Sequence, residues 1–204
     1  MSSFRPGICA AASTSGAGVG SASASRSTAS HAAAQIPGLK LDIRYATANN
    51  FTGRALYGAP RCMLRPAVVE RLARAQQAAA AQGLGLKVFD CYRPLAVQRA
   101  MWTLVPDERY VADPAKGSRH NRGAAVDLTL VDATGRELAM PTAFDDFSAR
   151  AHRDYQDLPA ATLANRALLE RIMQDAGFSG LATEWWHFDA DGWERYEILD
   201  VPLK

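Results

Sequence analysis

Apolar residues recur at helical spacing in three stretches of the chain. Over residues 64–82 they repeat every three or four positions; Pro66 stands where a first helical turn tolerates proline, and Gly83 supplies a stop. The same spacing predicts a second helix over residues 94–104 and a third over residues 163–176. We therefore expect three helices, separated by segments of other structure.

Shorter stretches with alternating apolar positions are typical of strands. Residues 132–135 have the composition of a hairpin turn and predict a return strand over residues 137–140. Further extended segments are expected over residues 39–46, 84–91, 124–131 and 183–189. Because helices come before, between and after strands that have hairpin-type links, the pattern predicts a single α+β domain with a mainly antiparallel sheet flanked by helices.

The first 35 residues differ in composition from the rest of the chain. They contain 23 Ala, Ser or Gly residues. Such a segment buries too little apolar surface to offset the entropy lost on ordering. We therefore expect a disordered tail over residues 1–35 and a folded domain over residues 36–204.

Overall composition is ordinary for a soluble globular protein, with 48% hydrophobic and 22% charged residues. The net charge of +2 comes from 23 basic and 21 acidic residues spread along the chain, which argues against nucleic acid as a partner. No run of apolar residues is long enough for a membrane span. No long apolar helix face stands out, so the oligomeric state stays unknown from the sequence.

The N-terminus and the cysteines bear on the cellular compartment. The N-terminal segment lacks the apolar run of a secretory signal, so we expect a cytoplasmic protein. Cys62 and Cys91 are most simply interpreted as buried thiols that act as small hydrophobic residues. A disulfide between them would instead favour an oxidising compartment such as the periplasm, reached through a mis-started export segment.

Two of the four histidines stand in strings that contain metal-ligating groups. His120 comes shortly before the strand that carries Asp127, and Gly123 allows the chain to turn so that the two side chains approach. His187 lies in the last predicted strand. Two histidines and one aspartate bind zinc well and leave a fourth position for water. Spacing alone also allows His120 and His187 to be ordinary hydrogen-bonded histidines.

Glu184 is the candidate base of such a site. Water on zinc loses a proton near neutral pH, and a carboxylate that is not a ligand must then accept this proton and pass it to the leaving amine. In an ideal strand, however, residues 184 and 187 point to opposite faces. The chain must therefore bend or bulge between Glu184 and His187 if both belong to one site.

The strings together resemble the D-alanyl-D-alanine dipeptidases of the vancomycin-resistance type. The first string reads Ser-x-His-x-x-Gly-x-Ala-x-Asp from residue 118, and the second reads Glu-Trp-Trp-His from residue 184. The similarity runs from about residue 41 to the end of the chain and includes Asp90-Cys91-Tyr92-Arg93-Pro94. The loop over residues 103–117 is shorter than in that family, which leaves the substrate range open.

The resemblance implies a zinc metallodipeptidase that hydrolyses D-Ala-D-Ala to two D-alanines and holds one zinc ion per subunit. The ligands would be His120, Asp127 and His187. Glu184 would be the general base and acid. Arg93 would stabilise the tetrahedral intermediate, since a fixed guanidinium favours charge that develops in the transition state.

The resemblance also implies substrate contacts. An acidic residue faces the free ammonium of the dipeptide and best matches Asp145, or Asp146 if the register slips by one residue. Tyr45 and Ser118 match other substrate-contacting positions. A carboxylate facing that ammonium explains a preference for dipeptides, because an acylated substrate would leave the charge unpaired.

Two other functions stay open from the sequence. The first is a zinc D,D- or L,D-carboxypeptidase that acts on peptidoglycan stem peptides. The second is a zinc-stabilised binding module without catalysis, against which the presence of both Glu184 and Arg93 argues. The sequence does not distinguish glycopeptide resistance from the recovery of D-alanine.

Overall fold

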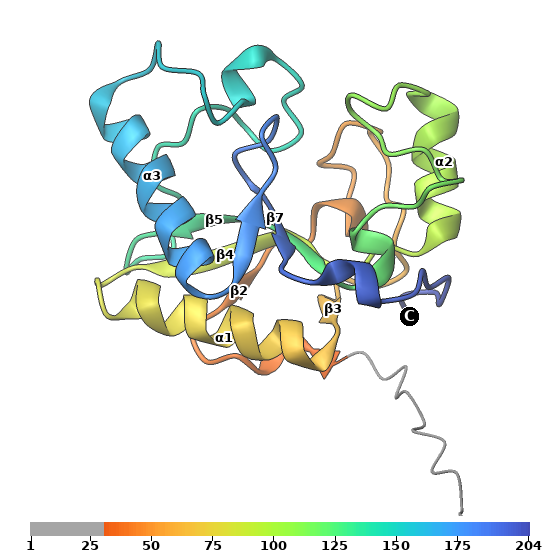
Figure 1. The fold of residues 1–204 in the computed structure, drawn as a ribbon, viewed down its shortest axis with the longest axis horizontal. Helices are drawn as coiled ribbons and strands as arrows, with labels where there is room; N and C mark the ends of the chain where they lie inside the picture. The colour runs from red at the N-terminus through yellow and green to blue at the C-terminus, as the bar shows by residue number, and fades with distance from the viewer. Residues whose placement is uncertain (1–30) are drawn as a thin grey trace, which may run out of the picture.

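The computed structural model describes residues 31–204, and its architecture confirms the predicted α+β class (Figure 1). Five strands form one sheet in the order β2-β4-β5-β7-β6. Their bounds are Lys40–Leu41 for β2, Gly85–Asp90 for β4, Ala125–Val131 for β5, Phe178–Gly180 for β6 and His187–Ala190 for β7. β2 pairs with β4 in parallel, and the other three pairs are antiparallel, so the sheet is mainly antiparallel as expected.

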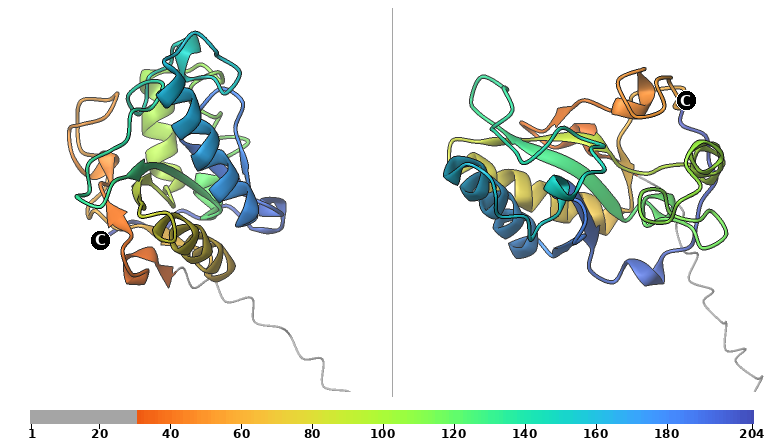
Figure 2. Two further views of the ribbon diagram at one scale, coloured as in Figure 1. Left: turned by 90° about the vertical axis from the view of Figure 1, so that its left-hand side faces the viewer. Right: turned by 90° about the horizontal axis from the view of Figure 1, so that it is seen from above.

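Three α-helices lie close to the predicted positions. They are α1 (Pro66–Ala80), α2 (Leu95–Leu104) and α3 (Ala160–Asp175). α1 and α3 pack against each other and against the sheet, whereas α2 lies apart from them beyond the end of β4 (Figures 1 and 2). The sheet therefore has a helical layer on one face.

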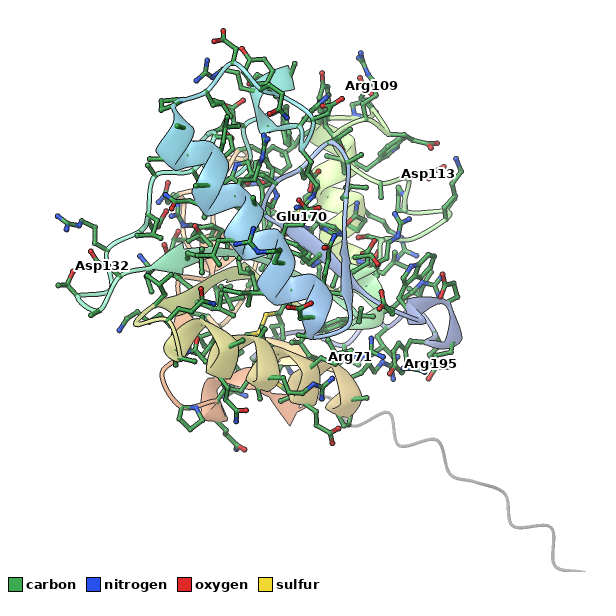
Figure 3. All side chains as sticks on the ribbon, turned by 60° about the vertical axis from the view of Figure 1, so that its left-hand side comes forward. Arg71, Arg109, Asp113, Asp132, Glu170 and Arg195 are labelled. Atoms are coloured by element: carbon green, nitrogen blue, oxygen red, sulfur yellow. A yellow bond between two sulfur atoms is a disulfide. The ribbon has the colours of Figure 1, made fainter. Side chains whose placement is uncertain are left out.

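The hydrophobic core lies between this helical layer and the sheet. The alternating residues Val126, Leu128 and Leu130 of β5 are fully buried, as are Leu72 of α1 and Leu169 of α3. Charged side chains such as Arg109 and Arg195 project from the periphery (Figure 3). All seven residues of β5 are buried, so the face opposite to the leucines is covered as well.

Three segments differ from the sequence-based expectation. The return strand expected over residues 137–140 is limited to one bridge between Val131 and Glu137, after which the chain leaves the sheet. The extended segment expected over residues 39–46 contains only the two residues of β2, followed by the 3-10 helix η2 (Arg44–Ala46). β6 was not predicted, because three residues are too few to show an alternating pattern.

The folded part begins earlier than residue 36. The strand β1 (His31–Ala32) pairs with β3 (Met63–Leu64), and the 3-10 helix η1 (Ala33–Gln35) follows. Ala33 is fully buried, and its backbone N–H donates to the carbonyl of Cys62 at 2.9 Å. The backbone of residues 31–33, assigned to the tail from composition, therefore pairs with residues 62–64 of the domain. The remainder of the predicted tail, residues 1–30, lies outside the described residues.

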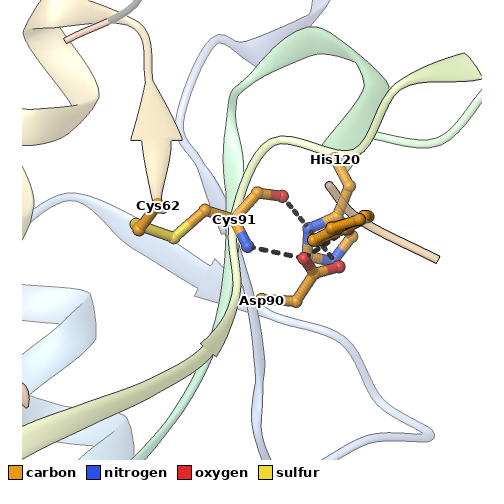
Figure 4. The surroundings of a disulfide bond; sticks show 5 residues. Cys62, Asp90, Cys91 and His120 are labelled. Carbon is orange, nitrogen blue, oxygen red and sulfur yellow. Dashed lines mark hydrogen bonds and ion pairs between the residues drawn. A yellow bond between two sulfur atoms is a disulfide. The ribbon is translucent and has the colours of Figure 1, made fainter. Parts of the chain in front are cut away.

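Cys62 and Cys91 form a disulfide, with a Cα–Cα distance of 5.2 Å (Figure 4). The interpretation of these residues as free thiols is therefore wrong. The bond joins the segment before β3 to the residue that directly follows β4. Across residues 31–204, no helix is long and apolar enough to cross a membrane.

Candidate active site

Three metal-ligating side chains converge where β5 and β7 pair. Asp127 and His187 are direct partners across these antiparallel strands, so their side chains leave the same face of the sheet side by side. His120 comes from the 3-10 helix η3 (His120–Arg122), whose C-terminal cap is Gly123. Gly123 has a φ of 64°, a left-handed conformation that suits glycine and lets the chain enter β5.

The distances among the three side chains are short. His187 Nδ1 lies 3.0 Å from Asp127 Oδ1. His120 Nε2 lies 3.2 Å from His187 Nδ1 and 3.4 Å from Asp127 Oδ1. Four ligands that surround zinc tetrahedrally at about 2.0 to 2.1 Å lie about 3.3 Å from one another. The donor atoms therefore match three corners of a zinc site, and all three residues are buried.

Each histidine is oriented by a hydrogen bond on its other ring nitrogen. His120 Nδ1 donates to the carbonyl oxygen of Cys91 at 2.6 Å (Figure 4), and His187 Nε2 donates to Asp189 Oδ1 at 2.9 Å. These bonds leave His120 Nε2 and His187 Nδ1 free for a metal, as in known metal-binding histidines. Asp189 was not predicted, although its place two residues after His187 puts both side chains on one face of β7.

Without a metal, protons compete for the same donor atoms. Burial alone would lower the pKa of His187, but hydrogen bonds to Asp127 and Asp189 raise it to about 10. Burial raises the pKa of Asp127, yet the two histidines outweigh this effect and hold it well below its usual range. The cluster therefore favours a bound cation, whether a proton or a metal ion.

Glu184 directly follows a turn at residues 182 and 183 and does not lie in a strand. The last strand was predicted over residues 183–189 but begins only at His187, so the bend that the site requires precedes it. Glu184 Oε2 consequently lies 3.8 Å from His187 Nδ1, and the side chain is 19% exposed. Burial raises the pKa of the Glu184 carboxyl, which suits a group that accepts and then donates a proton.

Arg93 is fixed by two residues that sequence analysis missed. Its Nε and one Nη donate to Asp90 Oδ2 at 3.1 and 2.8 Å, and its other Nη donates to Gln98 Oε1 at 2.9 Å. Asp90 is fully buried and also accepts a hydrogen bond from the Tyr57 hydroxyl at 2.6 Å. Asp90 is the partner of Asp127 across β4 and β5, so strand register could have pointed to it.

Asp145 faces Tyr45 on another wall of the site. The Tyr45 hydroxyl lies 3.0 and 3.1 Å from the two carboxylate oxygens of Asp145. Among residues 31–204, Asp145 is the one non-glycine residue with a positive φ, at 62°. Burial, and then the charge of Asp127, raise its pKa to about 8. The neighbouring Asp146 instead accepts the backbone N–H of Ser148 at 2.8 Å.

One cavity of about 250 Å³ connects these groups. This volume lies below the range of roughly 300–1,000 Å³ found for drug-sized ligands, so it suits a small molecule. Aromatic side chains, among them Phe51, Tyr110 and Trp186, form part of its wall. All eight site residues expected from the sequence line this cavity, namely Tyr45, Arg93, Ser118, His120, Asp127, Asp145, Glu184 and His187.

Comparisons with known proteins identify the family to which the chain is similar. The sequence profile of the D-ala-D-ala dipeptidase family matches residues 26–199. A D-alanyl-D-alanine dipeptidase of Escherichia coli (strain K12) is 40% identical over 167 residues, which cover 82% of this chain and 86% of that protein. A D-alanyl-D-alanine dipeptidase of Streptomyces coelicolor is 38% identical over 180 residues, which cover 75% and 86% of the two chains.

Solved structures with a similar chain path are more distant. The LdcB LD-carboxypeptidase aligns with a TM-score of 0.44 at 19% identity, covering 65% of this chain and 61% of its own. VanYB in complex with D-Alanine-D-Alanine aligns with a TM-score of 0.43 at 18% identity, covering 68% of this chain and 77% of its own.

Proposed function

Because the chain belongs to the D-Ala-D-Ala dipeptidase family of peptidases, we propose that it hydrolyses D-Ala-D-Ala to two D-alanines in a zinc-dependent reaction. The observation that carries this proposal is the convergence of three buried donor atoms at 3.0 to 3.4 Å from one another. A carboxylate that is not among the three, Glu184, lines the same cavity.

His120, Asp127 and His187 are the proposed ligands of one zinc ion per subunit. A buried set of two histidines and one carboxylate suits zinc and leaves a fourth position open. Zinc bound there supplies a nucleophilic water at neutral pH and polarises the scissile carbonyl. The hydrogen bonds from His120 to Cys91 and from His187 to Asp189 keep the two rings oriented for this role.

Glu184 acts as the general base and then as the general acid. Its carboxylate accepts a proton from the attacking water and delivers this proton to the nitrogen of the leaving D-alanine. The proximity of Glu184 Oε2 to His187 supports this assignment, at 3.8 Å from the proposed donor atom. The raised pKa of Glu184 brings the carboxyl closer to the pH at which proton transfer in both directions is efficient.

Arg93 stabilises the negative charge that develops on the carbonyl oxygen. Its three hydrogen bonds to Asp90 and Gln98 fix the guanidinium before substrate binds, so little reorganisation is needed in the transition state. Asp90 is held in turn by the Tyr57 hydroxyl and by the backbone N–H of Cys91.

Asp145 binds the ammonium group of the dipeptide, and Tyr45 and Ser118 make further substrate contacts. The half-buried Asp145 carboxylate lacks a cationic hydrogen-bond partner among the described residues; its hydrogen-bond partner is the neutral Tyr45 hydroxyl. An acylated N-terminus would leave this carboxylate without a counter-charge. This difference favours a free dipeptide over the stem peptides on which D,D- and L,D-carboxypeptidases act.

A comparison of two substrates tests this proposal. The zinc-loaded protein is incubated separately with D-Ala-D-Ala and with a muramyl pentapeptide that ends in D-Ala-D-Ala, and released D-alanine is measured. We expect release from the dipeptide and little from the pentapeptide. Only in the dipeptide does the residue before the scissile bond carry a free ammonium group that Asp145 can bind. Preferential cleavage of the pentapeptide would identify a carboxypeptidase instead.

We also propose that the protein works in an oxidising compartment and not in the cytoplasm. The disulfide between Cys62 and Cys91 supports this, since such bonds persist mainly outside reducing compartments. Mass spectrometry after alkylation of the native protein without reductant tests it. Protection of both cysteines is expected, whereas full alkylation of both would restore the cytoplasmic expectation.

A further inference from the structure

One arginine at the active-site cavity has no hydrogen-bond partner for its side chain. Arg93, Arg109 and Arg119 all line the cavity. Within residues 31–204, the Arg119 side chain donates no hydrogen bond, and its Nε is buried without a partner. The nearest anionic group is Asp189, whose Oδ2 lies 3.6 Å from that Nε, beyond hydrogen-bonding distance. Arg119 therefore retains its N–H donors for a ligand.

The Arg119 guanidinium is nevertheless held in position. Its central carbon lies 4.8 Å from the centre of the Trp193 ring, a cation–π contact that restricts the side chain. Trp193 opens the short 3-10 helix η5 (Trp193–Arg195), which follows β7. The side chain of Arg119 is 40% exposed, so it reaches the cavity while remaining open to solvent on one side. This arrangement favours a guanidinium that is positioned before a ligand binds.

The other two arginines already form hydrogen bonds with protein side chains. Arg93 uses three of its donors on Asp90 and Gln98 and faces the proposed reaction centre. Arg109 is 75% exposed on its side chain and pairs with Asp107. Arg119 differs from both in that its side chain makes no hydrogen bond among the described residues, although its Nε lies 3.6 Å from Asp189 Oδ2.

A dipeptide with two free ends carries two charges, and Asp145 accounts for only one of them. We propose that Arg119 binds the C-terminal carboxylate of the dipeptide and so selects substrates whose leaving residue ends in a free acid. A guanidinium matches a carboxylate with two parallel hydrogen bonds, which gives both strength and orientation. This inference rests on the proposed dipeptidase function and extends it to the second end of the substrate.

The test compares D-Ala-D-Ala with D-alanyl-D-alaninamide, in which a neutral amide replaces the carboxylate. In both substrates, cleavage of the peptide bond releases the N-terminal D-alanine. Arg119→Gln should lower kcat/KM for the acid by roughly 10- to 100-fold, mainly through KM, because charged hydrogen bonds are lost. For the amide, kcat/KM should change little. Arg119→Lys, which keeps a positive charge, should restore part of the preference for the acid.

Arg119 also lies near Asp189, which orients His187. The test must therefore distinguish direct binding of the carboxylate by Arg119 from an indirect effect through Asp189 on His187. If Arg119 acted only through Asp189, Arg119→Gln would lower kcat/KM for acid and amide in parallel, and this would overturn the proposal. The zinc content of each variant is measured alongside. Arg109→Gln is the matched control, since it removes an arginine that lines the same cavity and is paired with Asp107, and it should leave the acid-to-amide ratio unchanged.

The outcomes for the two proposals are distinct. A zinc-loaded wild-type protein that releases no D-alanine from the dipeptide would contradict the dipeptidase function, and the role of Arg119 with it. An active wild type whose preference for the acid persists in Arg119→Gln would contradict the role of Arg119 alone. If the preference were lost in Arg109→Gln instead, the carboxylate would be bound by Arg109 and not by Arg119.

Discussion

Three of the residues proposed to act on the metal or the substrate are hydrogen-bonded to a polar side chain beside them. Asp189 orients His187, Asp90 orients Arg93, and the Tyr45 hydroxyl faces Asp145. The effects of Asp189 and Asp90 are expected to be indirect, because these residues act on the orientation and charge of a group that touches metal or substrate. We therefore expect different effects from substituting a residue that acts directly on the substrate and from substituting a residue that orients another.

Loss of the proposed base should separate metal binding from turnover. Glu184→Ala is expected to keep about one zinc per chain, since Glu184 is not among the three converging donors. It should lower kcat by roughly 10²- to 10⁴-fold, the usual contribution of a positioned acid–base group. Zinc analysis and D-alanine release measure the two effects. Unchanged turnover in this variant would remove Glu184 from the mechanism.

Loss of an orienting residue should weaken the metal site itself. Asp189→Asn is expected to lower zinc affinity or activity by roughly 10- to 100-fold, because His187 loses a charged hydrogen-bond partner. Competition with a chelator of known affinity measures this change. Asp191→Asn is the matched control, since that exposed carboxylate accepts a hydrogen bond from Ser179 and not from a proposed ligand. Equal zinc affinity in both variants would contradict the role of Asp189.

Asp145 should make the stability of the metal-free protein depend on pH. Its folded-state pKa of about 8 lies above the ordinary value of 3.8, so the folded protein binds this proton more tightly than the unfolded chain. The associated stability is present at low pH and is lost as pH rises through about 8. Asp145→Asn, which stays neutral, should therefore raise Tm near about pH 9 and have little effect near about pH 4.

Thermal unfolding of the metal-free wild type and variant at the two pH values measures this difference. An equal shift in Tm at both values would show that the carboxyl does not titrate as described. The same comparison bears on function. An ionised Asp145 destabilises the free protein, and binding of the substrate ammonium beside it is expected to restore that stability.

At the scale of elements, the sequence predicted long periodic segments well and short ones poorly. Val68, Leu72, Ala75 and Ala79 recur at helical spacing along α1, so the helix is visible without any tertiary information. β6 and the turn before β7 are set by contacts with distant segments, such as the bond from Trp185 Nε1 to the Thr142 hydroxyl. Such contacts leave no local pattern. The proposed ligands could be predicted because chemistry restricts their residue types. The orienting residue Asp90 could have been found only through its pairing with Asp127, and Gln98 left no signal in the sequence.

The disulfide, which links the residue before β3 to the residue after β4, is expected to stabilise the folded protein. It closes a loop with a sequence separation of 29 residues, for which chain entropy predicts a contribution of about 3 to 4 kcal/mol. The double variant Cys62→Ser, Cys91→Ser should lose about that free energy of unfolding in denaturant titrations. Wild-type protein unfolded in the presence of a reductant should behave like the variant. A change below about 0.5 kcal/mol would show that the cross-link does not constrain the unfolded chain.

At the scale of the whole molecule, the cavity is assembled from segments that are far apart in sequence. Tyr45 precedes the first long helix, Asp127 lies in the central strand, and His187 lies near the end of the chain. A metal held by η3, β5 and β7 would join three of these segments. Metal binding and folding should therefore be thermodynamically linked.

Zinc should raise the thermal stability of the protein. Saturation at about 1,000 times the dissociation constant contributes about 4 kcal/mol, which corresponds to a rise in Tm of roughly 8 to 16 °C for a chain of this size. The rise should shrink as the pH falls, because protons compete with zinc for the buried His187 and Asp127. Differential scanning calorimetry with and without zinc measures it, and His187→Ala should abolish most of the effect.

The central claim is that zinc held by His120, Asp127 and His187 drives hydrolysis of D-Ala-D-Ala, and one measurement tests it most directly. Purified protein is stripped with a chelator, divided, and restored with zinc in one half, and D-alanine released from the dipeptide is followed in both. The account predicts release only in the zinc-restored half. Equal release from the stripped protein, or none from protein that holds one zinc per chain, would contradict it.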